Sequence, residues 1–127
     1  MREILWADDD AVGMLASLGD NLEAAGNLRL KRVLTYSAAL AALRQDTVSS
    51  LLVDVALPRG DGRLFARHLG LDLARIAITQ HSVAVVVFLT VVHDGDVLVA
   101  IAALKKANPT IVIDYFDKTQ LLAPKVI

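Results

Sequence analysis

The sequence predicts an α/β domain built on a doubly wound, five-stranded parallel sheet with helices on both faces. Short apolar runs alternate with segments whose apolar residues recur every three or four positions, as in βα repeats. Two of the runs are almost entirely apolar, which suits strands buried on both faces. The chain has 127 residues and is 55% hydrophobic, so a single domain over residues 1–127 can bury a sizeable core.

The N-terminal half of the chain contains three predicted strands and two predicted helices. The first strand covers residues 3–7 and leads into a group of aspartates. A helix follows, with Asp10 as its cap and Gly26 at its end. Its apolar face has spacings of three and four: Val12, Leu15, Leu18, Leu22 and Ala25. The next elements are an edge strand over 28–34, a helix over 37–45 capped by Ser37, and an apolar strand over 50–55.

The C-terminal half completes the alternation. The third helix is predicted over residues 62–70, and residues 71–82 either extend it after a break or form an extra turn. The strand over 83–90 is rich in β-branched residues, which favour strands. A helix over 96–108 and a fifth strand over 110–116 follow. Only a stub of helix can come after them, because Pro124 interrupts the last segment.

Composition excludes several classes of protein. The net charge is -1, with 13 basic and 14 acidic residues, so we expect neither a nucleic-acid nor a membrane surface. The absence of cysteine excludes disulfides and thiolate chemistry and is compatible with a reducing cytoplasm. The most apolar run is about half a membrane span long, and early charges leave no room for a signal peptide. We therefore expect a cytoplasmic domain.

Polar side chains follow the strands where each strand ends. Asp8 and Asp9 come after the first strand, Asp54 ends the third, Thr90 ends the fourth and Lys118 follows the fifth. In parallel α/β sheets, ligands bind beyond the carboxyl ends of the strands. We therefore expect these five side chains to share one rim of the sheet.

Three carboxylates on one rim need compensating positive charge. Two carboxylates about 4 Å apart repel by roughly 4 kcal/mol at an effective dielectric constant near 20. Lys118 supplies one positive charge, and Mg²⁺, which prefers oxygen ligands, would supply the rest. Beside both cations, Asp54 could attack phosphorus and form an aspartyl phosphate, with Thr90 and Lys118 on the phosphoryl oxygens. The sharp turn predicted after Asp54, with Pro58 and two glycines, would leave that nucleophile accessible.

Four motifs, in this order, resemble those of response-regulator receiver domains of the CheY-like family: ILWADDD, LLVDVALPRGDG, VVVFLT and DYFDKT. The resemblance extends over nearly the whole chain. It implies a flavodoxin-like fold with strand order 2-1-3-4-5, here with a fifth helix that is short or missing. It further implies a module of two-component signalling that catalyses, at most, its own phosphorylation and dephosphorylation.

The resemblance also implies partners and residue roles. A histidine kinase or phosphotransfer protein would donate a phosphoryl group to Asp54, and Asp8, Asp9, Asp54 and the backbone carbonyl of Ala56 would bind Mg²⁺. The catalytic residues would be Asp54, Thr90 and Lys118, the last two in contact with the phosphoryl group.

The resemblance also implies a conformational change on phosphorylation. Tyr115 matches the aromatic residue whose rotamer follows the phosphorylation state. Phosphorylation would draw Thr90 toward the phosphoryl group and repack the fourth helix against the fifth strand. We therefore expect a dimer or an output partner to bind at the face formed by these two elements.

Some positions depart from the family pattern. Thr119 follows Lys118 where proline is usual, and Val91 follows Thr90 where a small residue is usual. The segments from Asp54 to Thr90 and from Thr90 to Lys118 also look several residues longer than is usual in the family. These departures favour a second interpretation, in which the chain is a receiver-like interaction scaffold that works without phosphorylation.

A third interpretation is a Mg²⁺-dependent phosphohydrolase with an aspartyl nucleophile. It is disfavoured because Ala56 stands where a second acid would be needed, two residues after Asp54. Neither Ala56 nor Val92 can orient a water molecule with its side chain. We therefore predict slow loss of the phosphoryl group.

Overall fold

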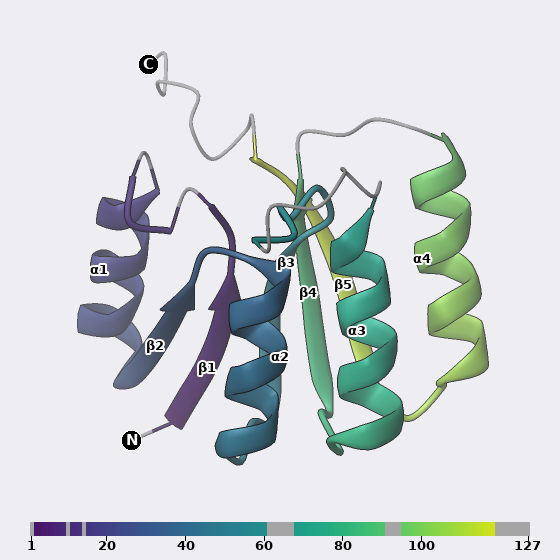
Figure 1. The fold of residues 1–127 in the computed structure, drawn as a ribbon, viewed down its shortest axis with the longest axis horizontal. Coiled ribbons are helices and arrows are strands. Elements are labelled where there is room, and N and C mark those ends of the chain that lie inside the picture. The colour runs from purple at the N-terminus through teal and green to yellow at the C-terminus, as the bar shows by residue number, and fades with distance from the viewer. Residues whose placement is uncertain (1, 10, 14, 61–67, 91–94, 119–127) are drawn as a thin grey trace.

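The computed structural model describes residues 2–9, 11–13, 15–60, 68–90 and 95–118. Five strands form one parallel sheet in the order β2-β1-β3-β4-β5 (Figure 1), which confirms the predicted topology. The strands are β1 (Arg2–Ala7), β2 (Leu28–Val33), β3 (Ser50–Asp54), β4 (Val85–Thr90) and β5 (Val112–Asp117). The helices that connect them are α1 (Ala16–Gly26), α2 (Tyr36–Gln45), α3 (Leu69–Gln80) and α4 (Gly95–Ala107).

Two apolar clusters pack on opposite sides of this sheet. The larger one joins α2, α3 and α4 to the sheet and includes the fully buried Val53, Val86 and Phe88. The smaller one joins α1 to β1 and β2 around Trp6 and Leu15. Because successive strand residues point to opposite faces, β1 contributes to both clusters.

Beyond α1, the second sheet face is sparsely covered within the described part of the chain. An apolar hollow of about 220 Å³ lies beside α1, and its lining includes Leu22, Leu52 and Phe116. Phe116 is 49% exposed. The fifth helix that was predicted to be short or missing falls on residues 119–127, which lie outside the described residues.

The start of α1 differs from the prediction. The helix begins at Ala16, and the described residues before it (9, 11–13 and 15) form turns. Val12, which was predicted to lie on the apolar face of this helix, is 61% exposed. The predicted cap, Asp10, lies outside the described residues. The predicted end is correct, because Gly26 is the last helical residue and Asn27 adopts the left-handed conformation that stops a helix.

The cap of α2 lies earlier in the chain than predicted. Thr35 is the N-cap, and its hydroxyl accepts a hydrogen bond from Ala38 N at 3.1 Å. Ser37 Oγ instead donates to Arg59 O, at 2.9 Å, in the loop that follows β3. The serine therefore serves a tertiary contact that its sequence neighbours do not reveal.

The third helix extends beyond its predicted end. Within the described residues, α3 runs from Leu69 to Gln80, so most of the ambiguous segment 71–82 is helical. His68, with φ of 62°, is left-handed, and an L-residue in that conformation interrupts a right-handed helix. Residues 61–67 lie outside the described residues. The remaining bounds agree within two residues, and no described helix is long and apolar enough to cross a membrane.

Candidate functional site

Three charged side chains meet at the carboxyl end of the sheet. Lys118 Nζ donates to Asp8 Oδ1 at 2.8 Å and to Asp54 Oδ2 at 3.0 Å. The exposed fractions are 0% for Asp8, 6% for Asp54 and 3% for Lys118. The predicted meeting of these residues, which are far apart along the chain, is thus confirmed.

The sheet itself places the two buried carboxylates. Asp54 is the last residue of β3 and pairs with Leu89 of β4. Asp8 follows the last residue of β1, and its backbone N–H donates to Val33 O at 2.9 Å, which continues the contact between β1 and β2 beyond the strand. Both carboxylates are therefore held by main-chain hydrogen bonding of central strands rather than by mobile loops.

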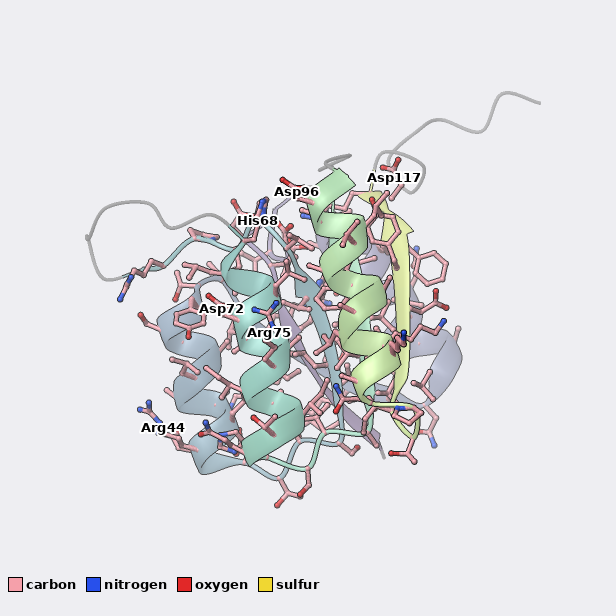
Figure 2. All side chains as sticks on the ribbon, turned by 90° about the vertical axis from the view of Figure 1, so that its right-hand side faces the viewer. Arg44, His68, Asp72, Arg75, Asp96 and Asp117 are labelled. Atoms are coloured by element: carbon pink, nitrogen blue, oxygen red, sulfur yellow. The ribbon has the colours of Figure 1, made fainter. Side chains whose placement is uncertain are left out.

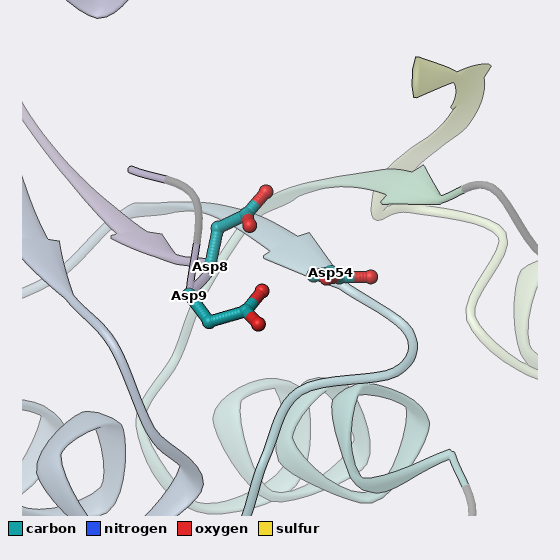
Figure 3. Close-up of side chains that lie close together, drawn as sticks. All are labelled: Asp8, Asp9 and Asp54. Carbon is teal, nitrogen blue, oxygen red and sulfur yellow. The ribbon is translucent and has the colours of Figure 1, made fainter. Parts of the chain in front are cut away.

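Asp9 completes an acidic group at this edge. One carboxylate oxygen from each of Asp8, Asp9 and Asp54 lies within 4.8 Å of the other two. Figure 3 shows the side chains of Asp8 and Asp9 side by side, both directed toward the end of β3 that carries Asp54. Asp9 is exposed, whereas the other two are buried, so the group opens to solvent on one side.

Burial and charge oppose each other in the ionisation of this group. Burial raises the pKa of Asp54 above its ordinary 3.8, and the charge and hydrogen bond of Lys118 offset only part of this effect. Burial lowers the pKa of Lys118, but the hydrogen bond to Asp8 and the charges of both carboxylates outweigh it, so this pKa lies above 10.5. Lys118 is therefore a permanent cation at neutral pH.

The turn after Asp54 is fixed at several points. Ala56 N donates to Asp54 Oδ1 at 3.1 Å, so the backbone orients the carboxylate. The first two N–H groups of α2 donate to the carbonyl groups of Pro58 and Arg59, at 2.8 and 3.1 Å. These helix N–H groups have no partner within the helix, and here the turn supplies one.

Gly70 is a site residue that the sequence analysis missed. Its N–H donates to Val55 O at 3.0 Å, and a Cβ at this position would lie 2.1 Å from the backbone oxygen of Asp54. The first turn of α3 therefore packs directly on the backbone that carries Asp54, and only glycine allows this approach. A glycine within an apolar helical pattern was the available signal for close packing.

The remaining predicted residues lie near this edge. Thr90 ends β4 opposite Asp117. Tyr115 is half-buried against the larger core, where burial and the charge of Asp117 raise its pKa above 10.0. Figure 2 shows Asp96 and Asp117 at the same end of the molecule. Val91 and Val92 lie outside the described residues.

The donor set fits a small divalent cation. Three carboxylates supply only hard oxygen ligands, which suit Mg²⁺. Among the described residues, no hydrogen-bond donor reaches the buried Oδ2 atom of Asp8. A buried anionic oxygen without a donor is costly, and a cation held between this atom and the neighbouring carboxylates would remove that cost.

Comparisons with known proteins identify the fold. No protein-family model and no curated protein matches the sequence. Three solved structures illustrate the likeness found at the level of the fold. The receiver domain of non-phosphorylated HemR from Leptospira biflexa has a TM-score of 0.64 and 22% identity, over 96% of this chain and 89% of that one.

Two further structures agree. A CheY-like receiver domain protein from Methanospirillum hungatei has a TM-score of 0.65 and 17% identity, over 93% of this chain and 82% of that one. A response regulator receiver protein from Pseudoalteromonas atlantica has a TM-score of 0.66 and 13% identity, over 94% of this chain and 90% of that one. The chain thus has the flavodoxin-like fold of response-regulator receiver domains.

Proposed function

We propose that this chain is a phosphoacceptor receiver domain of a two-component signalling system, with Asp54 as the acceptor. The observation that carries the proposal is the buried triad in which Lys118 Nζ contacts both Asp8 and Asp54. The fold of known receiver domains supports it.

Stability alone is a poor explanation for this triad. Removing charges from water costs several kcal/mol per ion, and a buried ion pair is often no more stable than an apolar replacement. Here two carboxylates share one lysine, and Asp9 adds a third negative charge nearby. Such an arrangement is typical of a site that binds a cation and a polar substrate.

The proposed chemistry begins with Asp54 Oδ1 or Oδ2 as the nucleophile. A bond forms between this oxygen and phosphorus while the bond from phosphorus to a nitrogen of the donor histidine breaks. The departing imidazole nitrogen keeps the electron pair. Lys118, a cation at neutral pH, stabilises the charge on the phosphoryl oxygens, and the hydrogen bond from Ala56 N orients the attacking carboxylate.

Asp8, Asp9 and Asp54 are the residues that would hold Mg²⁺, together with the backbone carbonyl of Ala56. When bound, the metal supplies positive charge that neutralises the phosphoryl oxygens. We assign Thr90 the remaining contact with the phosphoryl group. Among these residues, Asp9 is the exposed member.

Exposed side chains indicate where partners could bind. A histidine kinase or phosphotransfer protein must approach the carboxyl edge, where Asp9 is exposed. We place the output or dimer contact on the face formed by α4 and β5, where Leu98 and Val99 of α4 are 46% and 69% exposed. Tyr115 of β5 packs against the larger core, and we assign it the role of the switch residue.

Labelling with acetyl phosphate tests the proposal. In the presence of Mg²⁺, we expect one phosphoryl group per chain, and peptide mapping should locate it on Asp54. Asp54→Asn should abolish labelling. Asp72→Asn is a matched control, because Asp72 lies on the exposed side of α3, and this variant should be labelled like wild type. Labelling that persists in Asp54→Asn would contradict the assignment.

The alternative is a receiver-like scaffold that acts without phosphorylation. The exposed apolar side chains of Leu22 and Phe116, beside the hollow on the sparsely covered face, favour an interaction role. The same experiment separates the two functions. A folded wild-type chain that binds no Mg²⁺ and takes no label would support the scaffold.

A further inference from the structure

Arg32 of β2 is the centre of a second charged cluster, on the side of the sheet covered by α1. Its guanidinium donates to Asp20 Oδ1 at 2.7 Å and to Glu23 Oε1 at 3.0 Å, both on α1. The side chain of Arg32 is only 16% exposed, although that of Asp20 is 70% exposed. An arginine that only paired with two surface carboxylates would not need to be so deeply buried. The other contacts of Arg32 explain its burial.

These other contacts lead to the turn that follows the acidic pair. Arg32 Nη1 donates to the backbone oxygens of Ala11 and Ala16, at 3.1 and 3.3 Å. Ala11 N in turn donates to Asp8 O at 3.1 Å. One guanidinium therefore ties the backbone just after the acidic pair to the first residue of α1.

The adjacent strand residue fixes the other end of the same segment. Val33 O accepts from Asp8 N at 2.9 Å. Val33 thus holds the chain at Asp8, directly before Asp9, and Arg32 holds it at Ala11, two residues after Asp9. The side chain of Asp9 is exposed, so we expect its placement to depend on this backbone.

Close packing keeps the guanidinium in place. Arg32 Cζ lies 5.5 Å from the ring centroid of Trp6, a fully buried residue, at a distance suited to a cation–π interaction. A Cβ on Gly19 would lie 2.6 Å from Trp6 Cζ3 and 2.7 Å from Arg32 Nη2. Glycine at this position of α1 therefore leaves the space that the arginine occupies.

We propose that Arg32 is a positioning residue for the cation site, setting the turn that carries Asp8 and Asp9. The inference rests on the proposed binding of Mg²⁺ at that site. A ligand group that is held in place before binding loses less conformational freedom when the ligand arrives. Loss of the guanidinium contacts should thus weaken metal binding even though Arg32 does not touch the metal.

Calorimetric titration with Mg²⁺ alone tests this role. Arg32→Lys keeps the positive charge but cannot bridge two carbonyl groups and two carboxylates at once. We expect its dissociation constant to rise about tenfold, as when residues that support metal ligands are altered. Asp20→Asn is the matched control. It removes one exposed partner and leaves both carbonyl contacts, so its dissociation constant should stay close to that of wild type.

Gly19→Ala provides a second test that changes no charge. It should displace Arg32 and also weaken Mg²⁺ binding, while thermal unfolding without metal confirms that each variant is folded. Wild-type affinity in folded Arg32→Lys and Gly19→Ala would overturn the inference and leave the proposed function standing. Absence of Mg²⁺ binding by wild type would overturn both.

Discussion

Two cations of this molecule each bridge a pair of carboxylates, in opposite surroundings. Lys118 donates to one carboxylate just after β1 and one on β3, at 2.8 and 3.0 Å. Arg32 donates to two carboxylates of α1, at 2.7 and 3.0 Å. The side chains around Lys118 are at most 8% exposed, whereas those of the partners of Arg32 are 70% and 32% exposed.

The same geometry therefore has different consequences. The Lys118 cluster carries a large desolvation penalty, and we attribute its presence to the proposed binding of a cation. The ion pairs of Arg32 with partly exposed carboxylates contribute little to the free energy of folding. We therefore attribute its main role to the backbone segments that it connects. Substitutions in the two clusters should differ in size and in kind.

The largest effect on stability is expected from Lys118→Met. The substitution leaves two buried carboxylates facing each other without their cation, and breaking a buried pair in this way costs about 3–5 kcal/mol. Chemical denaturation at neutral pH, without Mg²⁺, measures the loss. The deficit should shrink in acid, where the carboxylates become neutral. A loss below that of an ordinary surface substitution would show that the cluster is solvated.

Gly70→Ala comes next. Alanine normally stabilises a helix relative to glycine by about 0.5–1 kcal/mol, but here a Cβ would lie 2.1 Å from Asp54 O. The start of α3 must move, and we expect a net loss of about 1–3 kcal/mol. Gly95→Ala is the matched control, because a Cβ at this first position of α4 meets no atom within 4 Å. Equal effects of the two substitutions would contradict the close approach.

The dependence of stability on pH separates the clusters further. Burial raises the pKa of Asp54 above 3.8, so the folded chain binds more protons than the unfolded chain between these two pKa values. The contribution of Asp54 to stability is therefore complete below pH 3.8 and is lost as the pH rises through its folded pKa. Asp54→Asn should gain stability relative to wild type over this window. Denaturation at several pH values without Mg²⁺ measures the difference, and the opposite trend would contradict the direction of the pKa shift.

The smallest effect is expected at Asp20, the exposed end of the Arg32 cluster. Asp20→Asn removes one partner of Arg32 whose side chain is 70% exposed. Such ion pairs contribute about 0–1 kcal/mol, and raising the salt concentration should narrow the difference from wild type. A loss comparable to that of Lys118→Met would mean that the two clusters are not different in kind.

The sequence alone predicts the parts of this molecule that depend on periodicity and topology. Alternating apolar runs predict the five strands, and a parallel sheet brings their carboxyl ends to one edge. Asp8, Asp54 and Lys118 can therefore be placed together from their positions in the chain, because each stands at the end of an apolar run. The lysine hydrogen bonds follow from the three-dimensional arrangement, since no spacing rule specifies them.

The features that could not be predicted depend on tertiary contacts. The start of α1 is set by turns tied to β2, and α2 is capped by Thr35 because Ser37 binds the loop after β3. The start of α3 follows from the contact of Gly70 with the backbone of Asp54. Arg32 looks like an exposed residue of an edge strand, and only the packing of α1 over β2 reveals its role.

We infer that the buried charges at the carboxyl edge bind a cation rather than stabilise the fold. The free energy of unfolding, measured by chemical denaturation with and without Mg²⁺, tests this most directly in wild type and in Asp9→Asn. At a concentration of Mg²⁺ about 100 times its dissociation constant, wild type should gain about 2.7 kcal/mol, and Asp9→Asn should gain far less. Equal responses of the two proteins to Mg²⁺, or no response in wild type, would contradict the account.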